Sequence, residues 1–290
     1  MADKTLTGTI KQRQGTATEW ESKNPTLAAG EFGYDTTNKQ TKIGDGVTPW
    51  NDLDWFATKS KPTFAESDWA TIAEVINNGN AAKYFAVGDK KTIALSTGEE
   101  VTVVILGFEH DDLADGSGKA AISIGMENCL ATTYAMNSSN TNVGGWESSI
   151  MRTETMATLL SQLPSDLQSL IKSVSKKATV GGGSSSTPAT SVQTSTDKLF
   201  LLAEVEIDGT TTAGYADEGT QYEYWKTVKD GTVAADRIKY LSNGGGSAVS
   251  WWLRSPNTTA STNFRGIRTT GSVGTSGASN TRGVSFGFCI

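Results

Sequence analysis

A long run of small polar residues lies between two apolar segments near the end of this chain. Residues 257–283 are NTTASTNFRGIRTTGSVGTSGASNTRG, preceded by WWLRSP and followed by GVSFGFCI. Ser- and Gly-rich runs are often disordered. However, Trp251, Trp252 and Leu253 would be costly to expose to water, because such side chains bury large apolar areas. We therefore expect an ordered segment held at both ends by core residues.

The residues after the run have the pattern of a β-strand. Apolar side chains alternate there with small ones, which is the period of a half-buried strand. The alternating residues are Val284, Phe286, Phe288 and Ile290. We expect a C-terminal strand with one face in the core.

Within the run we expect a hairpin with a fixed inner face and an interchangeable outer face. Ile267 and Val273 share one parity and are expected to point inward, and residues 269–271 suit a turn between them. Two interpretations of Phe264 stay open, a core residue that begins the hairpin and an exposed binding residue. The residues expected to face outward are Gly266, Arg268, Thr270, Ser272 and Gly274.

The composition favours a protein built from strands and loops. Only 37% of the 290 residues are hydrophobic and 19% are charged, while 31 are glycine. The net charge of −6 argues against a nucleic-acid-binding surface. No apolar run approaches the ~20 residues of a transmembrane helix. The start, MADKTLTGTIKQRQGT, lacks the apolar core of a signal peptide, so we expect synthesis in the cytoplasm without export by the usual route.

The first part of the chain is expected to form a small unit. The stretch GEFGYDTTNKQTKIGDG predicts a hairpin with arms at 32–34 and 41–43 and a turn at 37–39. Trp50 and Trp55 follow as apolar anchors. So short a unit buries little core, and oligomerisation is a natural way to stabilise it.

The rest of the chain alternates between helical and strand patterns, which indicates an α+β domain. We expect a helix in DWATIAEVINNGNAAKYF and two strands in KTIALSTGEEVTVVILGFEH. RTETMATLLSQL and PSDLQSLIKSVSK predict a second helical region, which starts its last helix near Pro164 and ends it at Lys176 and Lys177. GGGSSSTPATSVQTST is expected to be a flexible loop, and DKLFLLAEVEID a strand.

One histidine and two cysteines leave few routes to metal or nucleophilic chemistry. Cys129 and Cys289 are expected to be buried free thiols. After His110, the residues from Asp111 to Asp115 could bind Ca²⁺ through oxygen ligands, although their spacing differs from that of an EF-hand loop. Asp and Gly also make turns. We favour a turn and predict neither a metal nor a cofactor, and a Ca²⁺ ion in this loop stays an open alternative.

The N-terminal segment resembles a module found at the N-termini of bacteriophage tail-fibre and baseplate proteins. The matching stretch is LAAGEFGYDTTNKQTKIGDGVTPWNDL. Because chains with this module associate as trimers, the resemblance implies a homotrimer. Residues 1–57 would be a small β-rich trimerisation module that also contacts other phage tail proteins, and residues 58–65 a linker.

Residues 66–290 carry a second resemblance. The blocks VGDKKTIALSTGEE, GFEHDDLADGSGK, GGWESSIMR, DKLFLLAEVE, DEGTQYEYWKT and VSWWLRSP resemble a C-type-lectin-like domain, on the branch shared with formylglycine-generating enzymes. This domain is common in Gram-positive gut bacteria and their phages. With its polar run and its ending in GFC, the chain is similar to the variable proteins of diversity-generating retroelements. The phage major tropism determinant is a relative of that group. The resemblance implies a variable region at about 251–290.

The composition of the run agrees with the way such retroelements rewrite adenines. An Asn codon AAC changed at its first two positions can never encode Lys, Glu, Gln, Met or Trp, and residues 257–283 contain none of these five. Three of the seven arginines lie in the run, whereas all eighteen lysines lie elsewhere.

The resemblance implies a receptor-binding protein at the tip of a phage tail fibre that determines host tropism. It would be part of the virion, would be made in the bacterial cytoplasm, and would bind a host cell-surface protein or glycan without contacting nucleic acid or membrane. Small polar side chains with a few arginines are also typical of antibody-like binding surfaces. The predicted ligand-binding residues are Asn257, Thr258, Ala260, Thr262, Asn263, Arg265, Gly266, Arg268, Thr270, Ser272, Gly274, Thr275, Ser276, Ser279, Asn280 and Arg282.

Two other functions stay open. A glycan-cleaving tail depolymerase would need two carboxylates that converge across a groove, and Asp217 with Glu218 is one candidate pair. A bacterial surface adhesin could carry the same lectin-like domain. The cysteine and metal chemistry of formylglycine-generating enzymes is not expected, because Cys129 and Cys289 stand in no recognisable thiol motif. We therefore expect a binding protein and not an enzyme.

Overall fold

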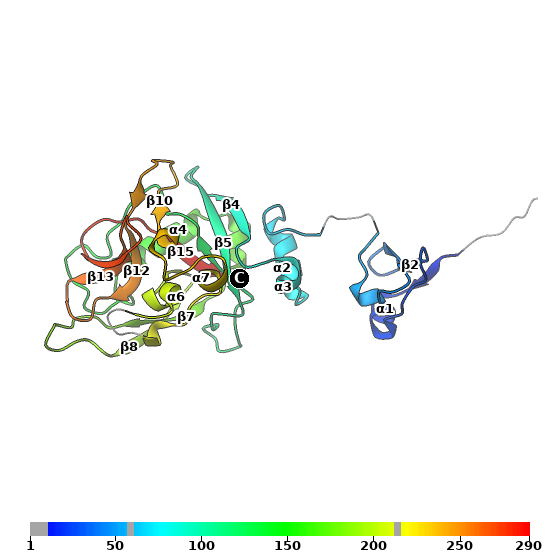
Figure 1. Cartoon of the computed structure of the whole chain (residues 1–290), viewed down its shortest axis with the longest axis horizontal. Helices are drawn as coiled ribbons and strands as arrows, with labels where there is room; N and C mark the ends of the chain where they lie inside the picture. Colours follow the sequence, from blue (N-terminus) through cyan, green and yellow to red (C-terminus); the bar gives the residue numbers. More distant parts are fainter. Residues whose placement is uncertain (1–10, 57–60, 212–215) are drawn as a thin grey trace, which may run out of the picture. The chain divides into compact units, whose positions relative to one another are not determined.

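The computed structural model of the chain describes residues 11–56, 61–211 and 216–290. Residues 1–62 and 63–290 form two compact units (Figure 1). Residues 1–10 of the expected N-terminal module, its last residue and residues 58–60 of the expected linker lie outside the described residues. The end of that linker belongs to the C-terminal unit, because Phe64 is buried there in edge-to-face contact with Trp69 and Phe85.

In the N-terminal unit the expected hairpin is confirmed. Strands β2 (Phe32–Asp35) and β3 (Gln40–Ile43) pair in antiparallel fashion, and β1 (Arg13–Gly15) joins β2 in parallel. The carboxylate of Asp35 accepts hydrogen bonds from the backbone N–H groups of Thr37 and Asn38, which fixes the turn between the strands.

Two tryptophans form the core of the N-terminal unit. Helix α1 (Ala17–Lys23) carries Trp20, and the short helix η1 (Trp50–Asp52) begins with Trp50. Their rings stack with centroids 4.0 Å apart and enclose the unit's interior together with Leu27. The described core of this unit is therefore small, as is usual for so short a segment.

The C-terminal unit is centred on a five-stranded sheet, and the mixed helix-and-sheet class expected from the sequence is confirmed. Its neighbouring strands follow the order β4-β5-β6-β15-β9, so the end of the chain lies inside the sheet. The strands are β4 (Lys90–Ala94), β5 (Glu100–Phe108), β6 (Ile122–Met126), β15 (Phe286–Cys289) and β9 (Leu199–Leu201).

Strand β15 is the expected C-terminal strand, but it is buried on both faces. The alternation of Phe286 and Phe288 with small residues predicted one exposed face, whereas Gly287 and Cys289 are also buried. A Cβ on Gly287 would lie 2.8 Å from the ring of Phe200, so the glycine makes room for that ring. Cys129 and Cys289 are buried free thiols, as expected.

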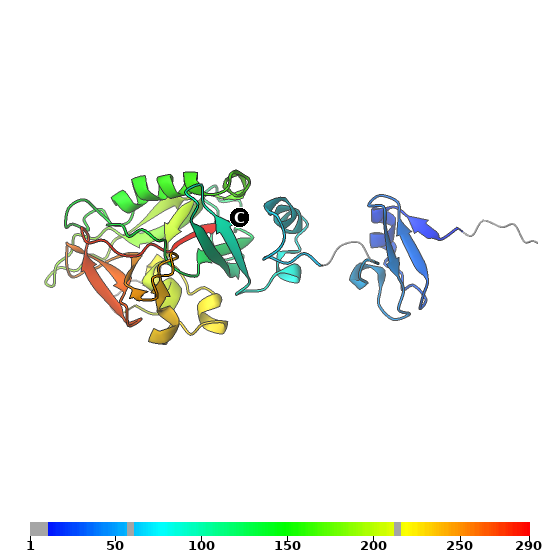
Figure 2. The same ribbon diagram turned by 90° about the horizontal axis from the view of Figure 1, so that it is seen from above.

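The expected helices lie in two places in the C-terminal unit: α2 and α3 at one end of it, and α4 and α5 along one side (Figure 2). They are α2 (Trp69–Asn77), α3 (Ala81–Tyr84), the π-helical turn η2 (Met151–Thr155), α4 (Met156–Gln162) and α5 (Ser165–Leu170). Asp68 caps α2 by accepting a hydrogen bond from the backbone N–H of Thr71.

The expectation that the last of these helices ends at Lys176 and Lys177 is wrong. Both residues lie in strand β7 (Val174–Thr179), which pairs with β8 (Val192–Asp197). The chain leaves the helix after Leu170 because the backbone N–H of Lys172 donates to the carbonyl of Cys289 instead of continuing the helix. Only residues 181–191 of the expected flexible loop lack regular structure, since β8 includes its second part.

The segment 197–208, expected to be one strand, is not one strand. Strand β9 covers Leu199–Leu201 and helix α6 covers Glu204–Asp208, with the side chains of Glu204 and Glu206 both buried. The remaining short elements are η3 (Ala216–Glu218), α7 (Tyr224–Thr227), η4 (Ala234–Arg237), β10 (Lys239–Tyr240) and β11 (Ala248–Val249).

A second, three-stranded sheet contains the polar run. Its order is β12-β13-β14, with β12 at Trp251–Pro256, β13 at Asn263–Ile267 and β14 at Val273–Gly277. In both ribbon views it lies at the end of the C-terminal unit farthest from α2 and α3 (Figures 1 and 2). Trp251, Trp252 and Leu253 are fully buried, which confirms them as core residues.

Candidate ligand-binding surface

The ordered hairpin expected in the polar run is present. Ile267 pairs with Val273, and the backbone N–H of Gly271 closes the turn by donating to the carbonyl of Arg268 at 2.8 Å. Gly271 has a φ of +78°, and a Cβ there would lie 1.7 Å from the carbonyl oxygen of Ala234. This position of the turn therefore requires glycine.

The expected outer face of the hairpin is wrong at two positions. Gly266 and Gly274 face each other in the register, and both are buried. A Cβ on Gly266 would lie 2.6 Å from the carbonyl oxygen of Trp251, and one on Gly274 would lie 2.7 Å from the guanidinium carbon of Arg268. Alternation along a strand places side chains on two faces, but it does not show that either face meets solvent.

Phe264 is a core residue, which settles the two interpretations of it. Its side chain has no exposed surface. Ser276 lies opposite it in the register and is also buried, with its hydroxyl accepting a hydrogen bond from Asn280. Ser276 therefore supports the hairpin and offers no exposed surface to a ligand.

Arg265 is also not a surface residue. Its guanidinium forms two hydrogen bonds, of 2.7 and 3.0 Å, to the buried carboxylate of Glu204 in α6. Paired donors in this arrangement are among the stronger charge-assisted contacts in proteins. Arg265 thus fastens β13 to α6.

Thr258 is buried as well. Its carbonyl accepts a hydrogen bond from the backbone N–H of Ala189, and a Cβ on Gly183 would lie 1.9 Å from the same oxygen. The loop 181–191 therefore packs closely against the start of the polar run.

The other predicted residues are wholly or partly accessible. Those that are exposed are Thr262, Arg268, Thr270, Ser279 and Asn280. Those that are half-buried are Asn257, Ala260, Asn263, Ser272, Thr275 and Arg282. The prediction omitted four further exposed residues, which are Thr259, Ser261, Thr269 and Thr281. The available signal was that Thr259, Ser261 and Thr269 lie in turns next to the strands.

Asn142 holds the loop between β12 and β13 in place. Its side-chain nitrogen lies 2.9, 2.8 and 2.6 Å from the carbonyl oxygens of Asn257, Ala260 and Asn263, and its side-chain oxygen accepts from the backbone N–H of Gly182. Asn142 itself is buried. One side chain thus joins two loops that are far apart in the sequence, and the sequence alone gave no signal for it.

The loop that carries Asn142 enlarges the accessible polar surface. Ser138, Ser139 and Asn140 are exposed, and a Cβ on Gly277 would lie 2.4 Å from the side-chain oxygen of Asn140. We define the candidate surface as the exposed parts of three segments: residues 137–143, residues 181–191 and residues 257–282.

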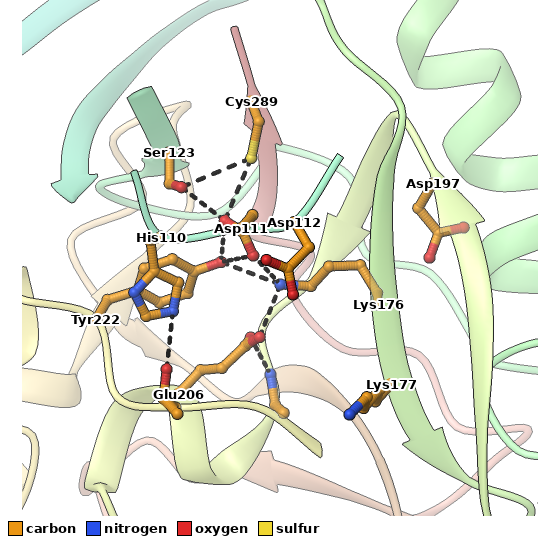
Figure 3. A network of polar contacts seen from close by, with 12 residues as sticks. His110, Asp111, Asp112, Ser123, Lys176, Lys177, Asp197, Glu206, Tyr222 and Cys289 are labelled. Carbon is orange, nitrogen blue, oxygen red and sulfur yellow. Dashed lines mark hydrogen bonds and ion pairs between the residues drawn. The ribbon is translucent and has the colours of Figure 1, made fainter. Parts of the chain in front are cut away.

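A buried ion network supports β12, the strand that precedes the polar run (Figure 3). The ammonium of Lys176 lies 2.6 Å from Asp111 and 2.7 Å from Glu206, and the guanidinium of Arg254 forms two bonds to Glu206. Tyr222 donates its hydroxyl to Asp111. Elements distant in the sequence are thereby fixed around β12.

The charges in this network keep one another ionised. Burial opposes ionisation of Asp111, but the neighbouring ammonium of Lys176 outweighs it and lowers the pKa of Asp111. Burial likewise opposes ionisation of Glu206, but the guanidinium of Arg254 outweighs it and lowers the pKa of Glu206. Breaking such a pair by removing one partner costs about 3–5 kcal/mol, because a buried charge is left uncompensated.

The loop after His110 does not have one uniform role. Asp111 is buried in the ion network, whereas Asp115 makes the expected turn by accepting a hydrogen bond from the backbone N–H of Ser117. Asp112 pairs with Lys119. Within residues 11–56, 61–211 and 216–290, no group of three or more His, Cys, Asp or Glu side chains could hold a metal ion.

The carboxylate pair considered for a glycan-cleaving enzyme does not converge. Glu218 is buried and accepts hydrogen bonds from Thr179 and Ser255, whereas the neighbouring Asp217 is exposed. Burial raises the pKa of Glu218. The hydroxyl and backbone contacts give this residue a structural role beneath β12.

A cavity of about 210 Å³ lies between the main sheet and residues 224–240. Its two carboxylates are each engaged, because Glu127 pairs with Lys90 and Asp236 accepts from Lys229 and from the backbone N–H of Asp230. Trp225 also lines it. The cavity therefore lacks a free pair of carboxylates of the kind that glycoside cleavage requires.

The family model described as "Domain of unknown function (DUF6273)" matches residues 123–290, and the model described as "Major tropism determinant N-terminal domain" matches residues 10–48. The second match supports a tropism-determinant-like phage protein. Neither the curated proteins nor the solved structures include a significant match to the chain. Among the described residues, no helix is both long enough and apolar enough to cross a bilayer.

Proposed function

This chain belongs to the DUF6273 family, and from that membership and its N-terminal module we propose that it is a receptor-binding protein of a phage tail fibre. It binds a host cell-surface ligand through the candidate surface and so determines which cells the phage recognises. The observation that carries the proposal is the match of residues 10–48 to the major tropism determinant N-terminal domain.

The construction of the candidate surface supports binding as its role. Its exposed side chains are short and polar, and they can change hydrogen-bond partners without rearranging a core. Beneath them lie fixed groups: the buried tryptophans of β12, the Arg265–Glu204 pair and the Asn142 side chain. Binding sites commonly combine adaptable loops with a rigid scaffold in this way.

We further propose that the exposed positions vary by the action of a diversity-generating retroelement, on a C-type-lectin-like domain. The buried positions limit that variation. Gly266 and Gly271 have no room for a side chain, because a Cβ there would meet a backbone carbonyl, and Arg265 has a fixed acidic partner. An adenine-rich near-copy of the codons for 250–290, next to a reverse transcriptase gene, is expected in the flanking DNA, and substitutions between the copies should avoid these three residues.

The proposal includes a homotrimer formed through the N-terminal unit. Phe32 and Phe56 are both partly exposed and make an edge-to-face contact with ring centroids 5.9 Å apart. Exposed apolar patches of this kind commonly mark association surfaces. The same unit is proposed to join the protein to other tail proteins of the virion.

The function is tested with purified protein and living cells. The fluorescently labelled protein is expected to bind cells of a susceptible host in flow cytometry and to compete with phage adsorption. A variant with Thr262, Thr270, Ser279 and Asn280 changed together to other small polar residues should fold and lose or change its target. If the protein binds no host cells, the receptor-binding proposal fails.

Two other results would favour a different function. Release of oligosaccharides from host surface glycans by the purified protein would favour a depolymerase. Anchoring of the native protein on bacterial cells that carry no phage would favour an adhesin. Neither result is expected.

A further inference from the structure

The candidate surface has an unusual charge for this protein. The chain has a net charge of −6, yet residues 257–283 contain three arginines and no Asp or Glu. Residues 137–143 and 181–191, the other two segments of the surface, contain no charged residue at all. Glu204 neutralises Arg265 beneath the surface. The charges of Arg268 and Arg282 are therefore balanced by no acid within these segments.

Arg282 is held rigidly at this surface. Its backbone forms two hydrogen bonds with Tyr134, each of 2.9 Å, and its guanidinium lies 5.5 Å from the ring centroid of Trp252. The side-chain Nε is buried and has no hydrogen-bond partner among the described residues. Because the Nε is buried, an external acceptor would be bound through the terminal nitrogens of the guanidinium, whose position is fixed by the aromatic ring.

Arg268 follows Ile267, which pairs with Trp251, and Arg282 precedes Gly283, which forms a bridge with the same residue of β12. The two arginines therefore flank the start of β12. Arg268 is exposed at the hairpin turn, and its guanidinium lies over Gly274, whose missing side chain leaves the space for it. Burial lowers the pKa of Arg282, and the like charge of Arg268 lowers it further. No ion pair joins either arginine to an acid within the part of the chain that the structure describes. Two like charges are thus kept near each other without a compensating anion.

We propose that Arg268 and Arg282 form an oxyanion-binding pair that takes the carboxylate, sulfate or phosphate groups of an acidic surface polysaccharide. The proposal rests on the proposed function and names the ligand class of the same surface. Planar guanidinium groups bind oxyanions through paired hydrogen bonds. An anion between the two arginines also removes the repulsion between them.

The surface favours a charged polysaccharide over a protein partner. Protein interfaces usually depend on a few buried aromatic or large apolar anchors. In the polar run Phe264 and Ile267 are buried in the core, and of the exposed large apolar residues of the described chain only Val143 lies in the candidate surface. The exposed groups are instead hydroxyls and amides, which can bind sugar hydroxyls, and guanidinium groups, which can bind acidic substituents.

The experiment measures binding of the full-length protein to defined polymers by biolayer interferometry at low and high salt. The probes are polygalacturonate for carboxylate, dextran sulfate for sulfate, poly(glycerol phosphate) for phosphate, neutral dextran, and polyglutamate as an acidic peptide. We expect binding to at least one acidic polysaccharide that weakens with salt, and none to neutral dextran.

Three variants identify the groups responsible. Arg268→Gln with Arg282→Gln should weaken the binding roughly tenfold or more, since a hydrogen bond to a charged group contributes that much. Arg268→Lys with Arg282→Lys keeps both charges but loses the planar donors, so this variant should bind the acidic polysaccharide more weakly than the wild type and more tightly than the glutamine variant. The control, Lys83→Gln with Lys226→Gln, removes two exposed positive charges outside the candidate surface and should leave polysaccharide binding unchanged. The single variant Arg268→Gln, at an exposed position, serves if the double variant does not fold.

Several results would overturn the oxyanion pair. They are no binding of the wild type to any acidic polysaccharide, equal binding by the glutamine or lysine variants, and a clear preference for polyglutamate. Flow cytometry separates these results from failure of the proposed function. If the wild type and the double glutamine variant bind host cells equally, receptor binding stands and the oxyanion pair is wrong. If the wild type binds polymers through the two arginines but binds no host cells, the pair stands and receptor binding is wrong.

Discussion

The side-chain nitrogen of Asn142 lies 2.6 Å from the carbonyl oxygen of Asn263 and so joins the loop 137–143 to the first residue of β13. The same nitrogen reaches two more carbonyls of the loop between β12 and β13. A surface built from short polar side chains has little apolar contact to hold its shape. This buried amide supplies the order that the exposed residues cannot supply themselves.

Replacing Asn142 with leucine is expected to destabilise that loop by about 1–3 kcal/mol, the cost of leaving buried acceptors unsatisfied. Hydrogen exchange followed by mass spectrometry should show faster exchange in residues 257–263. Ser139→Ala, at an exposed position of the same loop, is the control and should change neither stability nor exchange. Unchanged protection in the Asn142 variant would mean that other contacts hold the loop.

The exposed and buried positions of the polar run should respond oppositely to substitution. Exchanging Thr262, Thr270 and Ser279 for other small polar residues should change the free energy of unfolding by no more than about 0.5 kcal/mol. Gly271→Val and Ile267→Asp should unfold the hairpin, because a side chain at the first has no space beside the carbonyl of Ala234 and the second buries an unpaired charge. Urea denaturation of each variant gives the comparison. Equal losses in both groups would contradict this division.

Trp252→Ala should lower stability by roughly 3–5 kcal/mol, the usual loss for truncating a buried aromatic side chain. Trp252 has no exposed surface, and its indole nitrogen donates to the carbonyl of Tyr134. The measurement is the thermal midpoint, with the partly exposed Tyr240→Ala as a control. A Trp252 variant that keeps its midpoint but loses cell binding would place the ring in the binding surface instead of the core.

The buried ion network predicts a stability maximum between acid and strongly alkaline pH. The folded-state pKa values of Asp111 and Glu206 are below their ordinary 3.8 and 4.5, so their stabilisation is complete above these values and is lost as the pH falls further. The pKa of Lys176 is raised above 10.5 by the two carboxylates despite burial, so its stabilisation is lost at higher pH. The pKa of Glu218 is raised by burial, so its protonation at acid pH favours the folded state and partly offsets the loss of stability caused by Asp111 and Glu206.

The pH prediction is checked by urea midpoints measured from acid to alkaline pH. The wild type should lose stability below about pH 4.5, where the unfolded carboxylates begin to bind protons. Asp111→Asn should be less stable at neutral pH and should show a shallower acid decline, whereas the exposed Asp217→Asn should follow the wild type. An identical acid decline in Asp111→Asn and wild type would exclude the network as its cause.

The N-terminal unit should control the oligomeric state. Light scattering of the intact chain is expected to give about three times its 30.7 kDa mass. Phe32→Ser with Phe56→Ser should dissociate the trimer, because the two exposed rings would no longer be buried between copies. Val233→Ser, a polar change at an exposed residue of the C-terminal unit, should leave the mass unchanged. A monomeric wild type at micromolar concentration would contradict the trimer.

Local sequence patterns correctly predicted several elements because those elements depend on neighbouring residues. The hairpin of β2 and β3, helix α2 and the pair β4 and β5 each show their period and their turn within a short stretch. The core position of Trp251 to Leu253 followed from the cost of exposing such side chains. The presence of an ordered hairpin in the polar run followed from the apolar residues on both sides of it.

The sequence by itself thus determined those strands whose period and turn are local, several apolar residues that must be buried and the order of the polar run, whereas it placed β7 and β8 wrongly. Only the tertiary structure decided which polar residues face solvent. Thr258 and Arg265 are of residue types usual at a surface, but they are buried because Ala189 and Glu204 approach them from distant parts of the chain. In the sequence Lys176 likewise resembles a lysine at the end of a helix, whereas in the structure it lies in a strand and pairs with two carboxylates from distant parts of the chain. A polar side chain is stable in either place when its hydrogen bonds are satisfied, and the residues that satisfy them are brought together only by the complete fold.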